Sequence, residues 1–306
     1  MATLNESPHA GMSGCGIGCE AQSAAIPGGI TRVCNPANGP NPECDSRAEL
    51  VQRYLIPDWP APPGVRAVFT TRGATPADDA SRGPWAHFNL GAHVGDDARA
   101  VAANRAQLAA YMNARPVFLD QVHGAQVAVL DRGAPDGLRA DAAVTDAAGI
   151  ACTVLVADCL PVLLTNTAGR RVAAVHCGWR GLASGVLDNA LAAFLHNEVM
   201  AWLGPCIGPQ SFEVGTEVRA AFMARDADTA ACFAPQPGGK WLADLPALAR
   251  RRLAAAGVTR IFGNDGSARW CTVLNAALYF SYRRDQKPLG ATGRMAACIW
   301  LSGCAA

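Results

Sequence analysis

Three residues of metal-binding type stand beside small or turn-forming residues in this sequence. His123 precedes a glycine, Cys159 lies shortly before a proline, and His176 begins the segment His-Cys-Gly-Trp-Arg-Gly. We expect each at the end of a strand, where a side chain projects into a cleft and a neighbouring glycine lets backbone or substrate come close. Two imidazoles and one thiolate suit zinc, and three protein ligands leave the fourth tetrahedral position open, as in catalytic sites. Their spacing matches no local zinc motif, so they form one site only if the fold brings them together.

The same three residues are compatible with other chemistry. Cys159 could be the nucleophile of a cysteine hydrolase with His176 or His123 as its base, which predicts a free thiolate of low pKa. Two histidines and one cysteine are also the ligands of blue copper, but a multicopper oxidase needs roughly ten histidines, and the chain has six. A non-catalytic module stabilised by metal would close the site with a fourth protein ligand, such as Cys177 or Cys206.

The hydrophobic pattern predicts strands and helices in a mixed order, without strict alternation and without an internal repeat. The fold class is therefore expected to be α/β, a single compact domain over residues 55–302 with mixed β-sheets covered by helices. Strands are expected at 65–70, 117–119, 126–130, 150–156, 162–165, 172–176 and 296–301. Helices are expected at 97–112, 182–194 and 245–256.

The first part of the chain, residues 1–50, differs in composition from the rest. It is rich in Gly, Pro, Ser, Asn and Cys and has no sustained period of 2 or 3.6, so we expect a low-complexity, mostly disordered extension. Its cysteines could bind an accessory metal, although their spacing fits no common zinc template. These cysteines are Cys15, Cys19, Cys34 and Cys44.

The overall composition argues against several classes of partner. The net charge is +1 and no Lys/Arg-rich run occurs, so we expect no nucleic-acid binding. No apolar stretch approaches the ~18 residues that a membrane span needs, and no secretory signal is visible. The twelve cysteines are scattered without a Cys-x-x-Cys pair. A cytoplasmic protein with reduced thiols is the expectation.

A series of short segments occurs in the order of the laccase-domain (polyphenol oxidase-like) purine nucleoside phosphorylase family, which this chain resembles over roughly residues 55–302. The segments are Thr70–Gly73, Phe88–Gly91, His93–Asp97, Gln121–Gly124, Ala157–Pro161, Val175–Gly181, Gly204–Gly208, Phe280–Asp285 and Thr292–Arg294. The resemblance implies a compact α/β fold and a catalytic zinc on His123, Cys159 and His176. It implies phosphorolysis of purine nucleosides (adenosine, inosine, guanosine and methylthioadenosine) and hydrolytic deamination of adenosine. Some members of the family are thought to edit peptidoglycan precursors hydrolytically.

Phosphate and ribose also need polar partners. Arg72, Arg283 and Arg294 are the motif arginines best suited to hold phosphate, because the guanidinium fork matches its oxygens. The alternative is that they form structural or surface ion pairs. Asn89 could hydrogen-bond a ribose hydroxyl or cap its own loop. Asp158 could orient a metal ligand or cap the turn that follows it.

The sequence departs from the family pattern near the expected anion-binding rim. Asn275 stands where an aspartate usually precedes the Tyr-Arg-Arg segment, and residues 286–291 are an insertion. Both departures are expected to affect the geometry of that rim. His87 and His93 flank the Gly-rich loop and are expected to line the cleft.

Overall fold

A computed structural model of the chain describes residues 53–73, 80–194 and 198–303. All of them belong to one structural unit, Asn41–Ala306. They form three β-sheets with helices around them, so the predicted α/β class with mixed sheets covered by helices is confirmed. The extension over residues 1–50 and its cysteines lie outside the described residues.

The first sheet has five strands in the order β1-β2-β14-β6-β3. The central strand β14 runs antiparallel to both β2 and β6, whereas β3 runs parallel to β6. The strands are β1 (Tyr54–Leu55), β2 (Val65–Thr70), β3 (Arg115–Phe118), β6 (Ile150–Val156) and β14 (Met295–Leu301).

The second sheet has six strands in the order β13-β9-β7-β8-β5-β4. Neighbouring central strands, in the order β9, β7, β8 and β5, are antiparallel, and each edge strand adds in parallel. The strands are β4 (Val127–Val129), β5 (Ala142–Thr145), β7 (Leu160–Asn166), β8 (Val172–Cys177), β9 (Val199–Leu203) and β13 (Arg260–Gly263).

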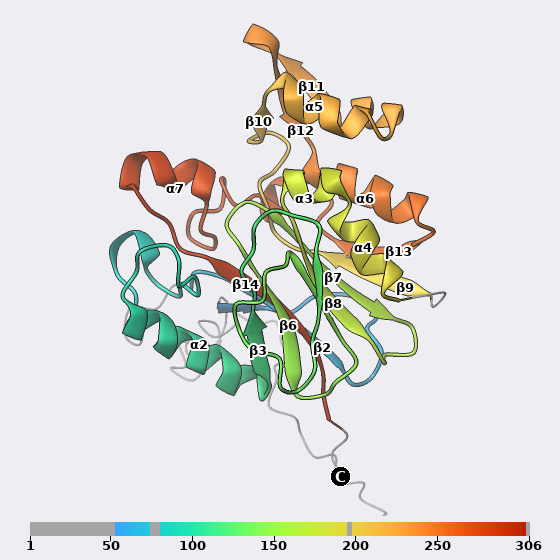
Figure 1. Cartoon of the computed structure of the whole chain (residues 1–306). Coiled ribbons are helices and arrows are strands. Elements are labelled where there is room, and N and C mark those ends of the chain that lie inside the picture. The colour runs from blue at the N-terminus through green and yellow to red at the C-terminus, as the bar shows by residue number, and fades with distance from the viewer. Residues whose placement is uncertain (1–52, 74–79, 195–197, 304–306) are drawn as a thin grey trace, which may run out of the picture. The chain divides into compact units, whose positions relative to one another are not determined.

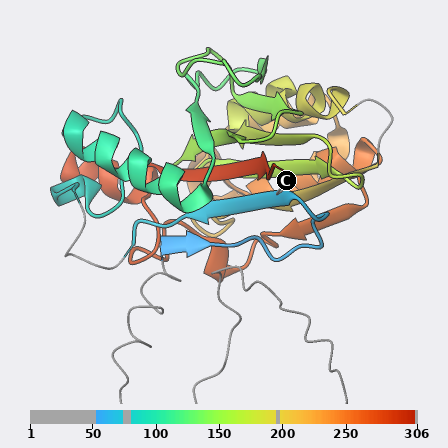
Figure 2. The same ribbon diagram turned by 90° about the horizontal axis from the view of Figure 1, so that it is seen from below.

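The two sheets pack face to face, and helices cover their outer faces (Figures 1 and 2). Alternate residues of β6 point to opposite sides, because side chains alternate along a strand. Cys152 and Val154 join Leu163 of the other sheet in the core between the sheets. Leu155 points outward and packs with Leu108 of helix α2 (Ala98–Met112). Strands buried on both faces explain the continuous apolar runs in the sequence.

The outer face of the six-stranded sheet is covered by further helices. Val162 and Leu164 of β7 belong to the same core cluster as Leu187 and Leu248 from two of these helices. The helices are α3 (Trp179–Ser184), α4 (Val186–Ala192) and α6 (Leu245–Ala255).

A small third sheet lies beside these helices, at the top of Figure 1. Its strand order is β10-β12-β11, and both pairings are antiparallel. It comprises β10 (Glu213–Val214), β11 (Phe233–Gln236) and β12 (Lys240–Ala243), accompanied by α5 (Thr216–Met223). The remaining helix, α7 (Tyr282–Leu289), precedes β14. Short 3-10 helices occur at Gly83–Trp85, Ala227–Cys232, Pro237–Gly239 and Ala268–Trp270.

Most expected elements have the predicted position, and one was wrong in its extent. Helix α2 begins after Asp97, whose carboxylate accepts the backbone N–H groups of Arg99 and Ala100 as an N-cap. The single helix expected at 182–194 is instead two short helices. Gly185 separates them with φ 95, and a Cβ there would lie 2.9 Å from a guanidinium nitrogen of Arg225. A left-handed glycine ends a helix in the manner of a C-cap.

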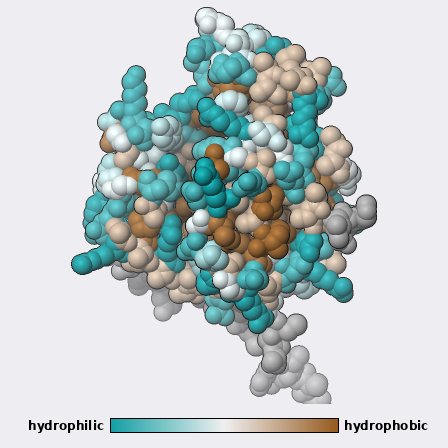
Figure 3. Space-filling view, in the orientation of Figure 1, coloured by the Kyte–Doolittle hydropathy of each residue, from teal (hydrophilic) through white to brown (hydrophobic). Residues whose placement is uncertain are grey.

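The surface seen in Figure 3 is largely hydrophilic, with a group of apolar residues near the middle of that face. Within the described parts of the chain, no helix is long and apolar enough to cross a membrane. Large apolar side chains are exposed at Ile56, Tyr111, Val122, Val129, Leu274, Tyr282 and Leu289.

Candidate metal centre

His176 is the most deeply buried of the three predicted ligands. It lies near the end of β8, is 3% exposed, and its backbone N–H donates to the Asp141 carbonyl at 2.7 Å. Its Nδ1 lies 2.8 Å from the carboxylate of Asp141. A carboxylate only accepts hydrogen bonds, so Nδ1 carries the proton and Nε2 is the nitrogen left to bind an ion.

His123 lies in the loop between β3 and β4. Its φ is 59, a left-handed conformation that a non-glycine residue adopts only when its surroundings hold it there. The carboxylate of Asp141 accepts its backbone N–H at 2.9 Å and that of Gly124 at 2.7 Å. The imidazole itself is exposed to solvent. The loop therefore presents one ligand from the solvent side of the pocket.

Cys159 lies where the chain passes from the five-stranded to the six-stranded sheet. Strand β6 ends at Val156, and β7 begins at Leu160 after a tight connection in which Asp158 has φ 88. The Asp158 carbonyl accepts the backbone N–H of Ile207 at 2.9 Å. This connection aims a partly exposed thiol at the two histidines.

The fold brings these three residues together. Their donor atoms all lie within 4.8 Å of one another, and the His123 Nε2 to Cys159 Sγ distance is 3.7 Å. A nitrogen and a sulfur bound to one tetrahedral zinc ion are roughly 3.6 Å apart, so the donor set fits such an ion. Gly178 makes the approach possible, because a Cβ there would lie 2.8 Å from His123 Cδ2 and 3.0 Å from Cys159 Sγ.

The electrostatics of the pocket suit a cation. Burial raises the pKa of Cys159, but the charge of His176 and hydrogen bonds with His123 and His176 outweigh it and bring the pKa to about 6. Burial lowers the pKa of His176, whereas the Cys159 thiolate and Asp141 raise it to about 9. For Asp141, burial raises the pKa, and hydrogen bonds from His176 and the loop amides lower it below its usual value. The Cys159 thiolate and the Asp141 carboxylate therefore place two negative charges beside the histidines.

A fourth protein ligand is not found in the described parts of the chain. There, His123, Cys159 and His176 are the only group of three or more His, Cys, Asp or Glu residues close enough to share an ion. Cys177 and Cys206 are fully buried, and burial raises the pKa of both thiols. The described residues therefore supply no fourth protein ligand of the kind that a purely structural metal site needs, and an ion held by these three would keep one position for water or substrate.

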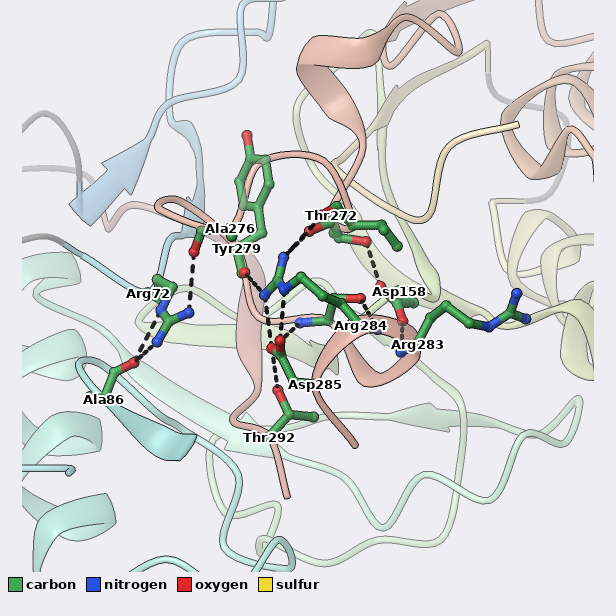
Figure 4. A network of polar contacts seen from close by, with 12 residues as sticks. Arg72, Ala86, Asp158, Thr272, Ala276, Tyr279, Arg283, Arg284, Asp285 and Thr292 are labelled. Atoms are coloured by element: carbon green, nitrogen blue, oxygen red, sulfur yellow. Dashed lines mark hydrogen bonds and ion pairs between the residues drawn. The ribbon is translucent and has the colours of Figure 1, made fainter. Parts of the chain in front are cut away.

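A polar network connects Asp158, the residue before Cys159, with helix α7 (Figure 4). The Asp158 carboxylate accepts the hydroxyl of Thr272 and, at 2.6 Å, the backbone N–H of Arg283 in the first turn of α7. Arg284 pairs with Asp285 at 2.6 Å and also donates to the carbonyl of Thr272 at 2.7 Å. Asp158 thus fixes the turn that carries Cys159, and the residue that orients the histidines is Asp141.

Two of the predicted phosphate ligands use both terminal guanidinium nitrogens within the protein. Arg72 donates to the Ala86 carbonyl at 2.6 and 3.1 Å and to the Ala276 carbonyl at 3.1 Å (Figure 4). Arg283 donates to the carbonyls of Ser211 at 3.2 Å and Glu213 at 3.0 Å. Both guanidinium groups therefore hold loops in place, which favours the structural alternative for them.

Arg294 is placed differently. Its Nη1 donates to the carbonyls of Thr292 and Gly293 at 3.1 and 3.0 Å, while Nε and Nη2 have no acceptor among the described residues. Burial lowers its pKa, and the negative charges of Cys159 and Asp158 oppose that effect. Arg294 therefore combines unused donors with proximity to the metal pocket.

Asn89 is fully buried inside its own loop. Its Oδ1 accepts the backbone N–H groups of Gly91 at 2.9 Å and Arg294 at 2.8 Å. Its Nδ2 donates to the Gly91 carbonyl at 3.2 Å and to Asp96 at 3.0 Å. Both donors and both acceptor positions are used, which favours loop capping over a contact with ribose.

The departures from the family pattern have local explanations. The Asn275 side chain donates to the carbonyls of Ala268 at 2.7 Å and Cys271 at 2.8 Å and so closes a turn. The insertion 286–291 supplies the second half of α7 and its cap at Gly290, which has φ 74.

His93 is exposed, and its pKa is lowered by partial desolvation and then by the charge of Arg294. The His93 side chain therefore lies close enough to Arg294 for the guanidinium charge to lower its pKa.

The described residues form an α/β protein with a candidate metal pocket. Two histidines and one cysteine line this pocket, and an ion bound there would keep one coordination position for a further ligand. The chain belongs to the family described as multi-copper polyphenol oxidoreductase laccase, whose model matches residues 66–302. It is 48% identical over 255 residues to purine nucleoside phosphorylase YfiH of Escherichia coli (strain K12), covering 82% of this chain and all of that protein. It is 46% identical over 251 residues to purine nucleoside phosphorylase PA4543 of Pseudomonas aeruginosa, covering 81% of this chain and 98% of that protein.

Solved structures agree with this assignment. The crystal structure of Neisseria meningitidis protein NMB0706 is similar with a TM-score of 0.73 and 45% identity, over 82% of this chain and 100% of that one. The crystal structure of YlmD from Geobacillus stearothermophilus is similar with a TM-score of 0.72 and 30% identity, over 82% and 96%.

Proposed function

We propose that this protein is a zinc-dependent purine nucleoside phosphorylase that acts on adenosine, inosine, guanosine and methylthioadenosine, and that it also deaminates adenosine. The observation that carries the proposal is the convergence of His123, Cys159 and His176, whose donor atoms lie within 4.8 Å of one another. The names of the similar bacterial proteins point to the same reaction class. The activity would belong to residues 55–302, with residues 1–50 as an extension.

Zinc suits this pocket better than a copper cluster. One thiolate and two imidazoles are borderline-soft donors, and the free fourth position is typical of catalytic zinc. When bound, zinc would act as a Lewis acid on a substrate atom. Additional copper ions would need further histidine clusters, and the described residues contain no second cluster.

Phosphorolysis also requires an anion site beside the pocket. The reaction passes through a sugar with oxocarbenium character, so phosphate must be held close to it. Arg294 is the best candidate, because its Nε and Nη2 have no acceptor in the described part of the chain and its charge lies near Cys159. Arg72 and Arg283 would support the site by holding loops.

The cellular location is proposed from the state of the cysteine thiols. All seven cysteines in the described regions are free, as expected in a reducing compartment. We therefore propose a cytoplasmic enzyme whose substrates are purine nucleosides and phosphate.

The decisive experiment combines metal analysis with product analysis. The purified protein should contain about one zinc ion per chain. With adenosine and phosphate it should release adenine and ribose 1-phosphate, and without phosphate only the deamination product inosine should accumulate. Base release that is independent of added phosphate would contradict a phosphorylase and indicate a hydrolase. A zinc-free protein with full activity would contradict the role of the metal.

A cysteine hydrolase is the second candidate, and one observation favours it. The pKa of Cys159 falls to about 6 because His176 and His123 outweigh the effect of burial, so without an ion the thiol would be ionised at neutral pH. This candidate predicts that chelation preserves hydrolysis and that iodoacetamide abolishes it. The zinc enzyme would lose activity on chelation and be protected from alkylation by the ion.

A further inference from the structure

The buried carboxylate of Asp141 contacts both histidines of the pocket. It is 0% exposed and accepts hydrogen bonds from the backbone N–H groups of Val122 at 3.2 Å, His123 at 2.9 Å and Gly124 at 2.7 Å. The fourth contact is with Nδ1 of His176 at 2.8 Å. The Asp141 side chain therefore accepts hydrogen bonds from three consecutive amides of the His123 loop and from the imidazole of His176 on β8.

The amide contacts determine the position of His123. Three successive N–H groups can converge on one carboxylate only if the loop curls around it, and His123 has φ 59 in that curl. A non-glycine residue in the left-handed region is strained unless its neighbours hold it. The Asp141 carboxylate is the group toward which all three amides point, so it stabilises the conformation that aims the His123 ring at Cys159.

The imidazole contact determines which nitrogen of His176 is available. An ionised carboxylate has no proton to donate, so the nitrogen facing it must be N–H. That leaves the lone pair on Nε2, the nitrogen on the far side of the ring from Asp141. A neutral hydrogen-bond donor in place of the carboxylate would favour the opposite tautomer and leave Nε2 protonated, without a lone pair for an ion.

We propose that Asp141 is a positioning residue that assembles the metal pocket by fixing the His123 loop and the metal-binding tautomer of His176 at the same time. The inference rests on the metal site of the proposed function and adds the group that makes two of its three ligands competent. Asp158 does not share this role, because its carboxylate contacts Thr272 and the backbone of α7.

Asp141→Asn tests the inference with almost no change in volume. In either orientation, the new amide N–H group faces at least one backbone or imidazole N–H group that formerly met an oxygen. We expect zinc affinity, measured by competition with a chromophoric chelator, to fall by about ten- to hundredfold. Asp244→Asn is the matched control. It exchanges the same atoms at the N-cap of α6, where Asp244 accepts the Ala247 N–H at 2.9 Å, and asparagine caps as well as aspartate.

A second measurement uses the unaltered protein and does not depend on the variant folding. Long-range proton–nitrogen NMR correlations distinguish the two histidine tautomers. With zinc bound, His176 of the wild type should carry its proton on Nδ1. In the metal-free protein the tautomers are compared above pH 9, where the imidazole is neutral; the wild type should then be protonated on Nδ1, and Asp141→Asn should shift toward the Nε2-protonated form.

Two outcomes would overturn the inference. One is zinc affinity in Asp141→Asn equal to that of the wild type and the Asp244→Asn control. The other is a wild-type His176 whose neutral ring carries its proton on Nε2, or that binds zinc through Nδ1. Neither measurement uses a nucleoside, so a protein that binds zinc in this way but releases no base would contradict the proposed reaction and leave the role of Asp141 intact. A wild type that binds no zinc would contradict the proposed function, and its His176 tautomer would still test Asp141.

Discussion

The metal pocket and the arginine-rich segment around α7 use hydrogen bonds in opposite ways. In the pocket, Asp141 occupies the Nδ1 atom of His176 and the loop amides, and the atoms that can bind an ion face one another. Around α7, the charged groups themselves are occupied. Arg284 is paired with Asp285 and with backbone carbonyls, and the Arg283 side chain holds two carbonyls. The donor atoms of the pocket could bind an added ion, whereas the side chains of both α7 arginines already hold partners within the protein.

This difference shows why motif arginines cannot be treated as equivalent. Arg72, Arg283 and Arg294 all lie in segments typical of the family, and each has the fork that suits phosphate. Their contacts separate them, because Arg294 alone among these three retains two guanidinium nitrogens, Nε and Nη2, without an acceptor in the described residues. A guanidinium with two unused nitrogens beside the pocket is a better anion ligand than one whose terminal nitrogens both hold loop carbonyls.

The largest effect is expected from Cys159→Ser. A hydroxyl is a poor substitute for a thiolate on zinc, so the variant should lose the metal and more than about a hundredfold of its activity, beyond what a supporting residue contributes. Metal content by plasma mass spectrometry and base release should fall together. Cys232→Ser is the control, since Cys232 is a buried free thiol outside the pocket. Full zinc occupancy in Cys159→Ser would refute the assignment of this ligand.

The next largest effect concerns Arg294→Ala. Charge-assisted hydrogen bonds to phosphate contribute roughly 1.5–3 kcal/mol, so phosphorolysis should fall by about ten- to hundredfold. Deamination consumes water, so it should change less. Arg294→Lys should recover part of the loss, because it retains the charge without the fork. Equal losses in both activities would mean that Arg294 shapes the fold and does not bind phosphate.

Arg72→Ala and Arg283→Ala are expected to have a smaller and different effect. Removing a guanidinium that satisfies backbone carbonyls should lower the free energy of unfolding by about 1–2 kcal/mol and the melting temperature by about 2–6 °C. Phosphorolysis and deamination should fall in parallel at matched zinc content. A selective loss of phosphorolysis with an unchanged melting temperature would return these arginines to the phosphate site.

The smallest effect is expected from deletion of residues 1–50. Their composition cannot build a core, and the family match begins only at residue 66. Zinc content and activity should stay unchanged, and so should the melting temperature. A fall of more than about 5 °C, which exceeds 1 kcal/mol for a chain of this size, would show that the segment packs on the domain or binds metal.

The sequence predicted the principal strands well because their signals are local. The apolar runs over Val65–Thr70 and Ile150–Val156 have the bounds of β2 and β6. Strand β5 was missed because Ala142–Thr145 is short and alanine-rich, and it becomes a strand only by pairing with β8 and β4. Such pairing is a tertiary effect that a single sequence does not display.

The ligands were easier to identify than the residue that supports them. His123 and His176 stand out by type, whereas Asp141 is one aspartate among many and lies before an unremarkable alanine pair. Its position directly before β5 becomes visible only with the fold, because that strand is itself not evident in the sequence. The contacts of the arginines were beyond prediction, because Arg72 reaches Ala276, far along the chain, through backbone atoms that carry no sequence signal.

The positions of the ligands relative to the two large sheets have a consequence for the order of folding. His123 follows β3 and precedes β4, and Cys159 follows β6 and precedes β7, so both lie where the chain passes from one sheet to the other. Separation of the two sheets would pull on both crossings and so displace these two donors from His176. Ion binding should therefore be tightest once the sheets have docked, and an ion bound there would act as a cross-link that slows their separation during unfolding.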